Sequence, residues 1–140
     1  MITLLKTHLN EIHRHGVEAY DEECCGAMLG SVNPNGEKQI IKLVRIENNS
    51  SEHRHRRFEV TPKDYQELEK KAKDEELTLL GFYHTHPNCP AQASETDLAY
   101  AWPFFSYIIL SVCDRVPKEI NSFVLNLDIE KFEPEEIKII

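Results

Sequence analysis

The chain has 140 residues, of which 41% are hydrophobic and 29% are charged, a composition typical of a globular protein that folds as one domain over residues 1–140. Its net charge of −8, counted with neutral histidines, argues against nucleic-acid binding, which needs a basic surface. No stretch reaches the ~20 apolar residues of a membrane-spanning helix, and no signal-peptide pattern opens the chain. We therefore expect a cytoplasmic protein that contacts neither nucleic acid nor a membrane.

The first third of the chain predicts a helix followed by a β-hairpin. Leu5, Leu9 and Ile12 share one helical stripe, which predicts a helix over residues 4 to about 18. A short apolar run at 24–30 predicts a buried strand, and a turn at 33–36 joins it to a second strand at 37–46. Three histidines of the predicted helix do not share a face, so we interpret them as surface residues without a metal role: His8, His13 and His15.

The middle of the chain predicts a polar loop at 47–57, a short extended piece at 58–60 and a second helix. The loop contains the one basic cluster, His53 to Arg57, which we interpret as a solvated loop or a docking surface for an acidic partner. Thr61 fits an N-cap, Pro62 the first helical position and Asp64 the first turn, which predicts a helix that ends near residue 75.

The second half of the chain predicts four strands and one short helix. The strands are expected at 77–85, 105–112, 120–127 and 132–140, and the strand at 105–112 is apolar enough to be buried on both faces. The short helix begins at Ser94 and is stopped by Pro103. The order of elements predicts a mixed α/β fold, in which helices pack against a curved sheet.

Two histidines at the end of the strand 77–85 are the strongest candidates for metal ligands. Side chains two apart in a strand point to the same face, so His84 and His86 project together. Catalytic zinc takes three protein ligands and a water, and Asp97, in the first turn of the helix that Ser94 begins, is the best candidate for the third ligand. Cys89 is a weaker competing ligand because it lies in a loop.

Hydrolysis at such a site needs a general base beside the water. Glu22 and Glu23 are both candidates, and Glu23 is better placed because it directly precedes the strand at 24–30. Ser94 could donate a hydrogen bond to the oxyanion of the reaction, a contribution typically of about 3 kcal/mol, and could also cap its helix. The four cysteines form no Cys-x-x-Cys pair, and we expect free thiols, with Cys24 and Cys25 packed in a strand.

Taken together, these residues resemble the JAMM signature of the MPN metalloprotease family. The signature is His-x-His, seven residues and Ser-x-x-Asp, and it matches His84, His86, Ser94 and Asp97 in this sequence. Glu23, three residues before a glycine in the first long strand, resembles the second element of the family, which is the reason to prefer Glu23 over Glu22. The resemblance extends from the first helix to about residue 112.

The resemblance implies a single MPN domain with a layout similar to cytidine deaminases. It implies one zinc ion per chain, held by His84, His86 and Asp97, with Glu23 activating the water and Ser94 steadying the intermediate. Family members cleave the peptide or isopeptide bond after the C-terminal glycines of ubiquitin-like proteins. The small prokaryotic members are linked to ubiquitin-like sulfur carriers, from which they remove C-terminal residues or an attached amino acid such as cysteine.

Two alternatives remain within the same superfamily. A RadC-like, non-peptidase member shares His-x-His-Pro and Ser-x-x-Asp, but such chains carry an additional N-terminal domain associated with DNA, and the acidic charge argues against DNA. A non-catalytic MPN scaffold usually lacks one or more of the ligands, and here the whole set is present. The substrate-binding residues and the oligomeric state are not indicated by the sequence.

Overall fold

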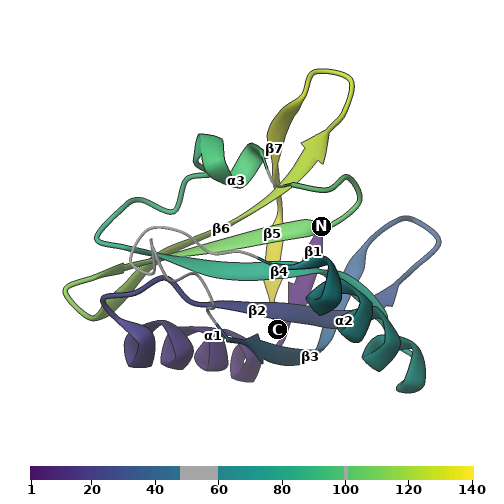
Figure 1. Cartoon of the computed structure of the whole chain (residues 1–140), viewed down its shortest axis with the longest axis horizontal. Helices are drawn as coiled ribbons and strands as arrows, with labels where there is room; N and C mark the ends of the chain where they lie inside the picture. Colours follow the sequence, from purple (N-terminus) through teal and green to yellow (C-terminus); the bar gives the residue numbers. More distant parts are fainter. Residues whose placement is uncertain (48–59, 100) are drawn as a thin grey trace.

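The computed structural model of the chain describes residues 1–47, 60–99 and 101–140 (Figure 1). These residues form three helices and one eight-stranded mixed sheet with the strand order β7-β6-β5-β4-β2-β3-β1-β8. The elements in chain order are β1 (Ile2–Leu4), α1 (Lys6–Ala19), β2 (Cys25–Val32), β3 (Lys38–Ile46), α2 (Pro62–Asp74), β4 (Thr78–Pro87), α3 (Glu95–Ala99), β5 (Ser106–Cys113), β6 (Val116–Asn126), β7 (Lys131–Glu135) and β8 (Ile137–Ile139). The predicted α/β class is confirmed.

The central strand β4 is hydrogen-bonded to antiparallel β2 on one side and to parallel β5 on the other (Figure 1). Helices cover both faces of this part of the sheet. Ile12 of α1 packs with the core residues of one face, and Leu68 of α2 packs with those of the other face. Burial on both faces explains why β4 and β5 are nearly continuous apolar runs rather than alternating ones. The C-terminal ends of β4 and β5 are held by their mutual pairing, which runs as far as Pro87 and Val112.

A β-bulge in β4 decides which side chains face α2. The pairing with β2 shifts between Met28 and Leu29, so that two residues of β4 oppose one step of β2. Gly81 lies at the bulge with φ of 149°, and a Cβ there would lie 1.9 Å from the carbonyl oxygen of Ser106. As a result Leu79 and Phe82, three residues apart, both face α2. His84 continues the Phe82 face because it lies two residues further along the strand.

The C-terminal segment brings the two ends of the sheet together. β7 pairs with β6, and β8, only one residue later, pairs in parallel with β1. The amide of Ile2 donates to the carbonyl of Glu136 at 2.9 Å, and the amide of Ile140 donates to the carbonyl of Leu4 at 3.0 Å. The sheet is therefore strongly curved and nearly closed, and the two termini lie close together (Figure 1).

Two sequence predictions at the chain ends were wrong for the same reason. The predicted helix at residue 4 begins at Lys6, because residues 2–4 form β1 between β3 and β8. The predicted strand 132–140 is two strands, interrupted at Glu136 where the chain leaves β6 for β1. Both differences come from pairing between distant parts of the chain. By contrast, the hairpin β2–β3 is confirmed, and so is the helix capped by Thr61, whose hydroxyl accepts from the Asp64 amide.

Two predicted segments lie wholly or partly outside the described residues. The basic cluster from His53 to Arg57 and the first two residues of the extended piece at 58–60 lie outside the described residues. In the parts of the chain that are described, no helix combines the length and the apolar character required to cross a membrane.

The interpretation of the α1 histidines as surface residues was wrong for His8 and His15, which are both 8% exposed. The Nδ1 atom of His8 accepts from the Leu5 amide at the start of α1. The Nδ1 atom of His15 lies 2.6 Å from the hydroxyl of Tyr83 in β4. Burial, with a smaller effect of Arg45, lowers the pKa of His15 from 6.5 to about 4, against an opposing effect of Glu18. His15 is therefore a neutral residue of the core.

We expect His15 to make the protein less stable at acidic pH. The unfolded chain takes up a proton on this histidine as the pH falls through 6.5, whereas the folded chain resists protonation until about pH 4. Stability is therefore lost progressively over that interval. His15→Gln, which does not titrate, should show a shallower pH dependence of the unfolding free energy in urea titrations. An unchanged dependence would contradict the burial of a neutral His15.

Candidate metal centre

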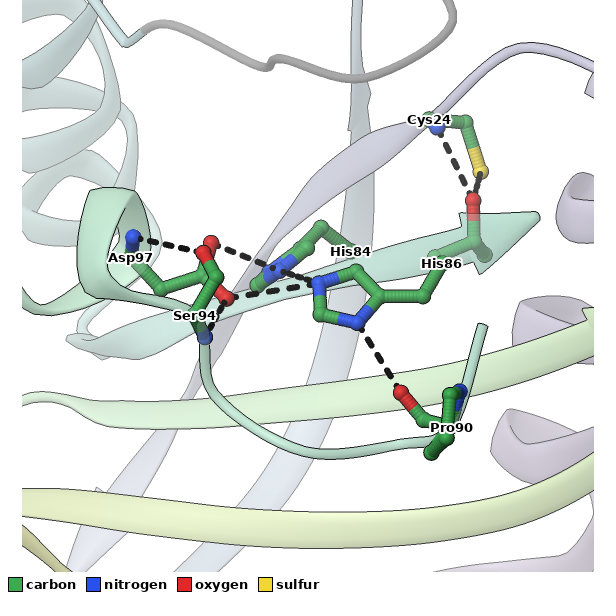
Figure 2. Close-up of polar contacts among 7 residues, drawn as sticks. Cys24, His84, His86, Pro90, Ser94 and Asp97 are labelled. Atoms are coloured by element: carbon green, nitrogen blue, oxygen red, sulfur yellow. Dashed lines mark hydrogen bonds and ion pairs between the residues drawn. The ribbon is translucent and has the colours of Figure 1, made fainter. Parts of the chain in front are cut away.

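Three separate segments meet at the C-terminal end of β4 (Figure 2). β4 supplies His84 and His86, the short helix α3 supplies Asp97, and the segment just before β2 supplies Glu23. β4 is paired with β5 up to Pro87, so both histidines lie on a strand that is hydrogen-bonded along its whole length. The side chain of His84 is 9% exposed and that of His86 is 12% exposed, which leaves the site close to the surface but largely shielded from water.

The two imidazoles and the Asp97 carboxylate form a triangle of three groups, in which a different Asp97 oxygen faces each histidine. The Nε2 atoms of His84 and His86 lie 3.1 Å apart. Asp97 Oδ1 is 3.2 Å from His84 Nε2, and Asp97 Oδ2 is 3.3 Å from His86 Nε2. Ligands about 2.1 Å from a tetrahedral zinc ion are separated by roughly 3.4 Å, and the three contacts are close to this spacing. The three side chains could therefore hold a zinc ion.

Ser94 fixes the position of Asp97 through a capping box. The Ser94 hydroxyl accepts from the Asp97 amide at 3.0 Å, and the Asp97 carboxylate accepts from the Ser94 amide at 2.8 Å (Figure 2). The capping role predicted for Ser94 is therefore confirmed. Since a hydroxyl can accept and donate at once, the Ser94 proton can still be donated to a bound substrate.

The carbonyl of Pro90 sets the tautomer of His86. It lies 3.1 Å from His86 Nδ1 and can only accept, so Nδ1 carries a proton and Nε2 is the ring nitrogen that faces Asp97 and His84 (Figure 2). A histidine that binds a metal commonly donates its other ring N–H in this way. This contact has no signature in the sequence, because any residue can supply a main-chain carbonyl.

Glu23 lies beside the two histidines and is 6% exposed. One of its carboxylate oxygens is within 4.8 Å of a ring nitrogen of each histidine. The ligand atoms of Glu23, His84 and His86 therefore form a second group of three, in addition to the one that the two histidines form with Asp97. Glu22, the other predicted candidate, is partly exposed and does not belong to the group, and neither does the exposed Cys89.

The site holds two carboxyl groups whose pKa values are shifted in opposite directions. Burial raises the pKa of Glu23 to about 7, with Asp97 adding to the shift and His86 opposing it. Burial acts to raise the pKa of Asp97 as well, but hydrogen bonds from His84 and His86 outweigh it and hold that pKa far below its usual range. Burial acts to lower the pKa of His86, but its contacts with Asp97 and Pro90 raise it. Asp97 is therefore ionised, and Glu23 can take up a proton near neutral pH.

A family model for prokaryotic homologs of the JAB domain matches residues 5–126. The chain belongs to this family. The match runs beyond the predicted limit near residue 112 and includes β6. The resemblance inferred from the JAMM signature is thereby confirmed, together with the MPN fold that it implied. A comparison with curated proteins found no match.

Solved structures agree with the family assignment. A protein from Salinibacter ruber is 37% identical, with a TM-score of 0.76 over 99% of this chain and 91% of that one. Protein DSY2949 from Desulfitobacterium hafniense is 27% identical, with a TM-score of 0.86 over 100% and 93%. A structure of JAMM, a metalloprotease-like zinc site in the proteasome and signalosome, is 17% identical, with a TM-score of 0.58 over 100% and 98%. At that identity the last likeness shows the fold alone.

Zinc binding should depend on Asp97 and not on Cys89. Asp97→Ala removes one corner of the triangle, so the purified protein should lose its zinc, measured by elemental analysis, and should no longer gain thermal stability when zinc is added. Cys89→Ser is the control, since this thiol lies outside the group, and it should keep one ion per chain. Zinc loss in Cys89→Ser, or full zinc content in Asp97→Ala, would contradict the proposed ligand set.

Proposed function

We propose that this protein is a zinc metallopeptidase that hydrolyses the peptide or isopeptide bond after the C-terminal Gly-Gly of a ubiquitin-like sulfur-carrier protein. The observation that carries the proposal is that two carboxyl groups lie beside the same pair of histidines and differ in their protonation. Asp97 is ionised and in contact with both imidazoles, whereas Glu23, next to the same imidazoles, has a pKa of about 7. Such a pair suits one ligand and one general base.

The ligand set that we propose is His84, His86 and Asp97. Both Asp97 oxygens lie within 3.3 Å of the histidine nitrogens, and an ionised carboxylate is the better ligand for a cation. Glu23 shares the histidines and could complete a different set of three. With Asp97 as the third ligand, the Glu23 carboxylate remains beside the site, where it can accept a proton from the water and release it again.

Zinc, when bound, would lower the pKa of its water toward 7 and polarise the substrate carbonyl. The residues of the chain would do the rest. Glu23 takes the proton of the attacking water and passes it to the leaving amine, so that its net protonation is unchanged after one cycle. The Ser94 hydroxyl donates to the oxygen of the carbonyl under attack, where negative charge develops. The Pro90 carbonyl keeps His86 in one orientation throughout.

The proposed substrate class follows from the family and from the form of the site. The site is at the end of a strand, close to the surface, and a flexible Gly-Gly tail can approach such a position in extended form. We place the reaction in the cytoplasm, where the four free thiols of the chain remain reduced.

Glu23→Gln should separate metal binding from catalysis. The amide cannot accept the proton, so cleavage of a ubiquitin-like carrier extended beyond its Gly-Gly should fall by a factor on the order of 10² to 10⁴, while zinc content stays at one ion per chain. Cleavage is followed by mass spectrometry of the released segment. Glu22→Gln is the matched control at the adjacent glutamate and should retain activity.

The result also separates the peptidase from its alternatives. A wild-type protein that binds zinc but cleaves no Gly-Gly-extended carrier would favour a non-catalytic MPN scaffold. Retained cleavage in Glu23→Gln would overturn the assignment of the base while leaving the peptidase in place. Loss of zinc in Glu23→Gln would show that Glu23 is itself a ligand.

A further inference from the structure

Thr85 lies between the two histidines in sequence but faces the opposite side of the sheet. Its side chain is directed toward α1, where a Cβ added to Gly16 would lie 3.0 Å from the Thr85 methyl carbon. Thr85 is 1% exposed. The residue therefore does not contact the metal centre directly, and its hydroxyl needs a partner inside the protein.

The partner of the Thr85 hydroxyl is Cys24, the residue that follows Glu23. The Thr85 amide donates to the Cys24 carbonyl at 3.0 Å, as expected for an antiparallel pair. The Cys24 amide, however, donates to the Thr85 hydroxyl, also at 3.0 Å, and the hydroxyl lies 3.5 Å from the Cys24 sulfur. A side-chain hydroxyl thus takes the place of a main-chain carbonyl just beyond the last residue pair of the β2–β4 ladder.

This contact acts on the peptide group that joins Glu23 to Cys24. The N–H that Thr85 accepts belongs to that peptide group, which is planar, so the hydrogen bond also fixes the direction of the Glu23 carbonyl and of its Cα. The regular ladder begins one residue later, with Cys25 opposite His84. Thr85 therefore links β4, the strand that carries the histidines, to the segment that carries Glu23.

We propose that Thr85 is a positioning residue, whose hydroxyl holds the Glu23 carboxylate at the correct distance from His84 and His86. The proposal rests on the function proposed above for this site. Thr85 suits the task because it has two separate contacts: the methyl packs on α1 at Gly16, and the hydroxyl binds Cys24. Each of the two contacts can be removed by its own substitution, which leaves the other contact in place.

The test compares Thr85→Val with Thr85→Ser. Valine keeps the methyl contact and loses the hydroxyl, whereas serine keeps the hydroxyl and loses the methyl. Thr85→Val should lower kcat by a factor on the order of 10 to 10², because misplacing a catalytic group by a fraction of an ångström to one ångström costs about that much. KM and zinc content should stay unchanged, and Thr85→Ser should restore kcat to within about threefold of the wild type.

A second measurement does not depend on activity. In the zinc-free protein, exchange of the Cys24 amide hydrogen, followed by NMR, should be at least about tenfold faster in Thr85→Val than in Thr85→Ser. A purely structural role predicts that kcat follows thermal stability in both variants. Wild-type kcat in Thr85→Val, or a loss of kcat that follows zinc content, would overturn the positioning role. A wild-type protein without zinc-dependent cleavage would overturn the proposed function itself, and the positioning role with it.

Discussion

The pairing of β4 with β2 and β5 is the constraint on which the rest of the site depends. β4 is hydrogen-bonded to β2 as far as His84 and to β5 as far as Pro87, so the part of the strand that carries the histidines is paired with its neighbours. The bulge at Gly81 then sets which face His84 and His86 occupy. Since the positions of the imidazoles are fixed by the backbone, Asp97 and Glu23 need only be brought to them from neighbouring segments. Asp97 is held by the capping box with Ser94. Glu23 is held by the hydrogen bond between its neighbour Cys24 and Thr85.

The environment makes two chemically similar carboxyl groups different. Both are largely buried, which by itself favours the protonated form. Asp97 has two imidazoles and the Ser94 amide against its oxygens, and these contacts more than compensate for the loss of water. Glu23 is 6% exposed and has the ionised Asp97 nearby, so burial dominates and its pKa rises to about 7. The difference arises because Asp97 lies between the histidines and the start of α3, whereas Glu23 approaches from the side of β2.

Local sequence signals predicted much of this structure, and non-local pairing accounts for most of what they missed. Thr61, Pro62 and Asp64 mark the start of α2, and Asn33 to Gly36 marks the β2–β3 turn, because these preferences are properties of a few adjacent residues. β1 was not predicted, and its last residue, Leu4, was assigned to the first helix because it fits the apolar stripe of α1 equally well. Its pairing with β3 and β8 depends on residues more than thirty positions away, which no local pattern reveals.

In the site too, local sequence signals predicted some of the residues, whereas contacts between distant residues were missed. The histidines and Asp97 were predicted from spacing, whereas the choice of Glu23 over Glu22 came from the resemblance to the JAMM family. The structure brings both Asp97 and Glu23 to the two histidines. The burial of His15 was missed because a histidine on an amphipathic helix gives no signal of a partner such as Tyr83. The contacts of Pro90 and Thr85 were missed because they involve main-chain atoms, whose directions follow from the fold and not from residue type.

X-ray absorption spectroscopy of the zinc-loaded protein, together with a crystal structure recorded at the zinc edge, tests the central claim most directly. The account predicts one zinc ion per chain, bound by His84, His86 and Asp97 at about 2.0–2.2 Å, with an oxygen of water as the fourth ligand and Glu23 hydrogen-bonded to that water. An ion bound directly by the Glu23 carboxylate, or one that leaves Asp97 uncoordinated, would contradict it.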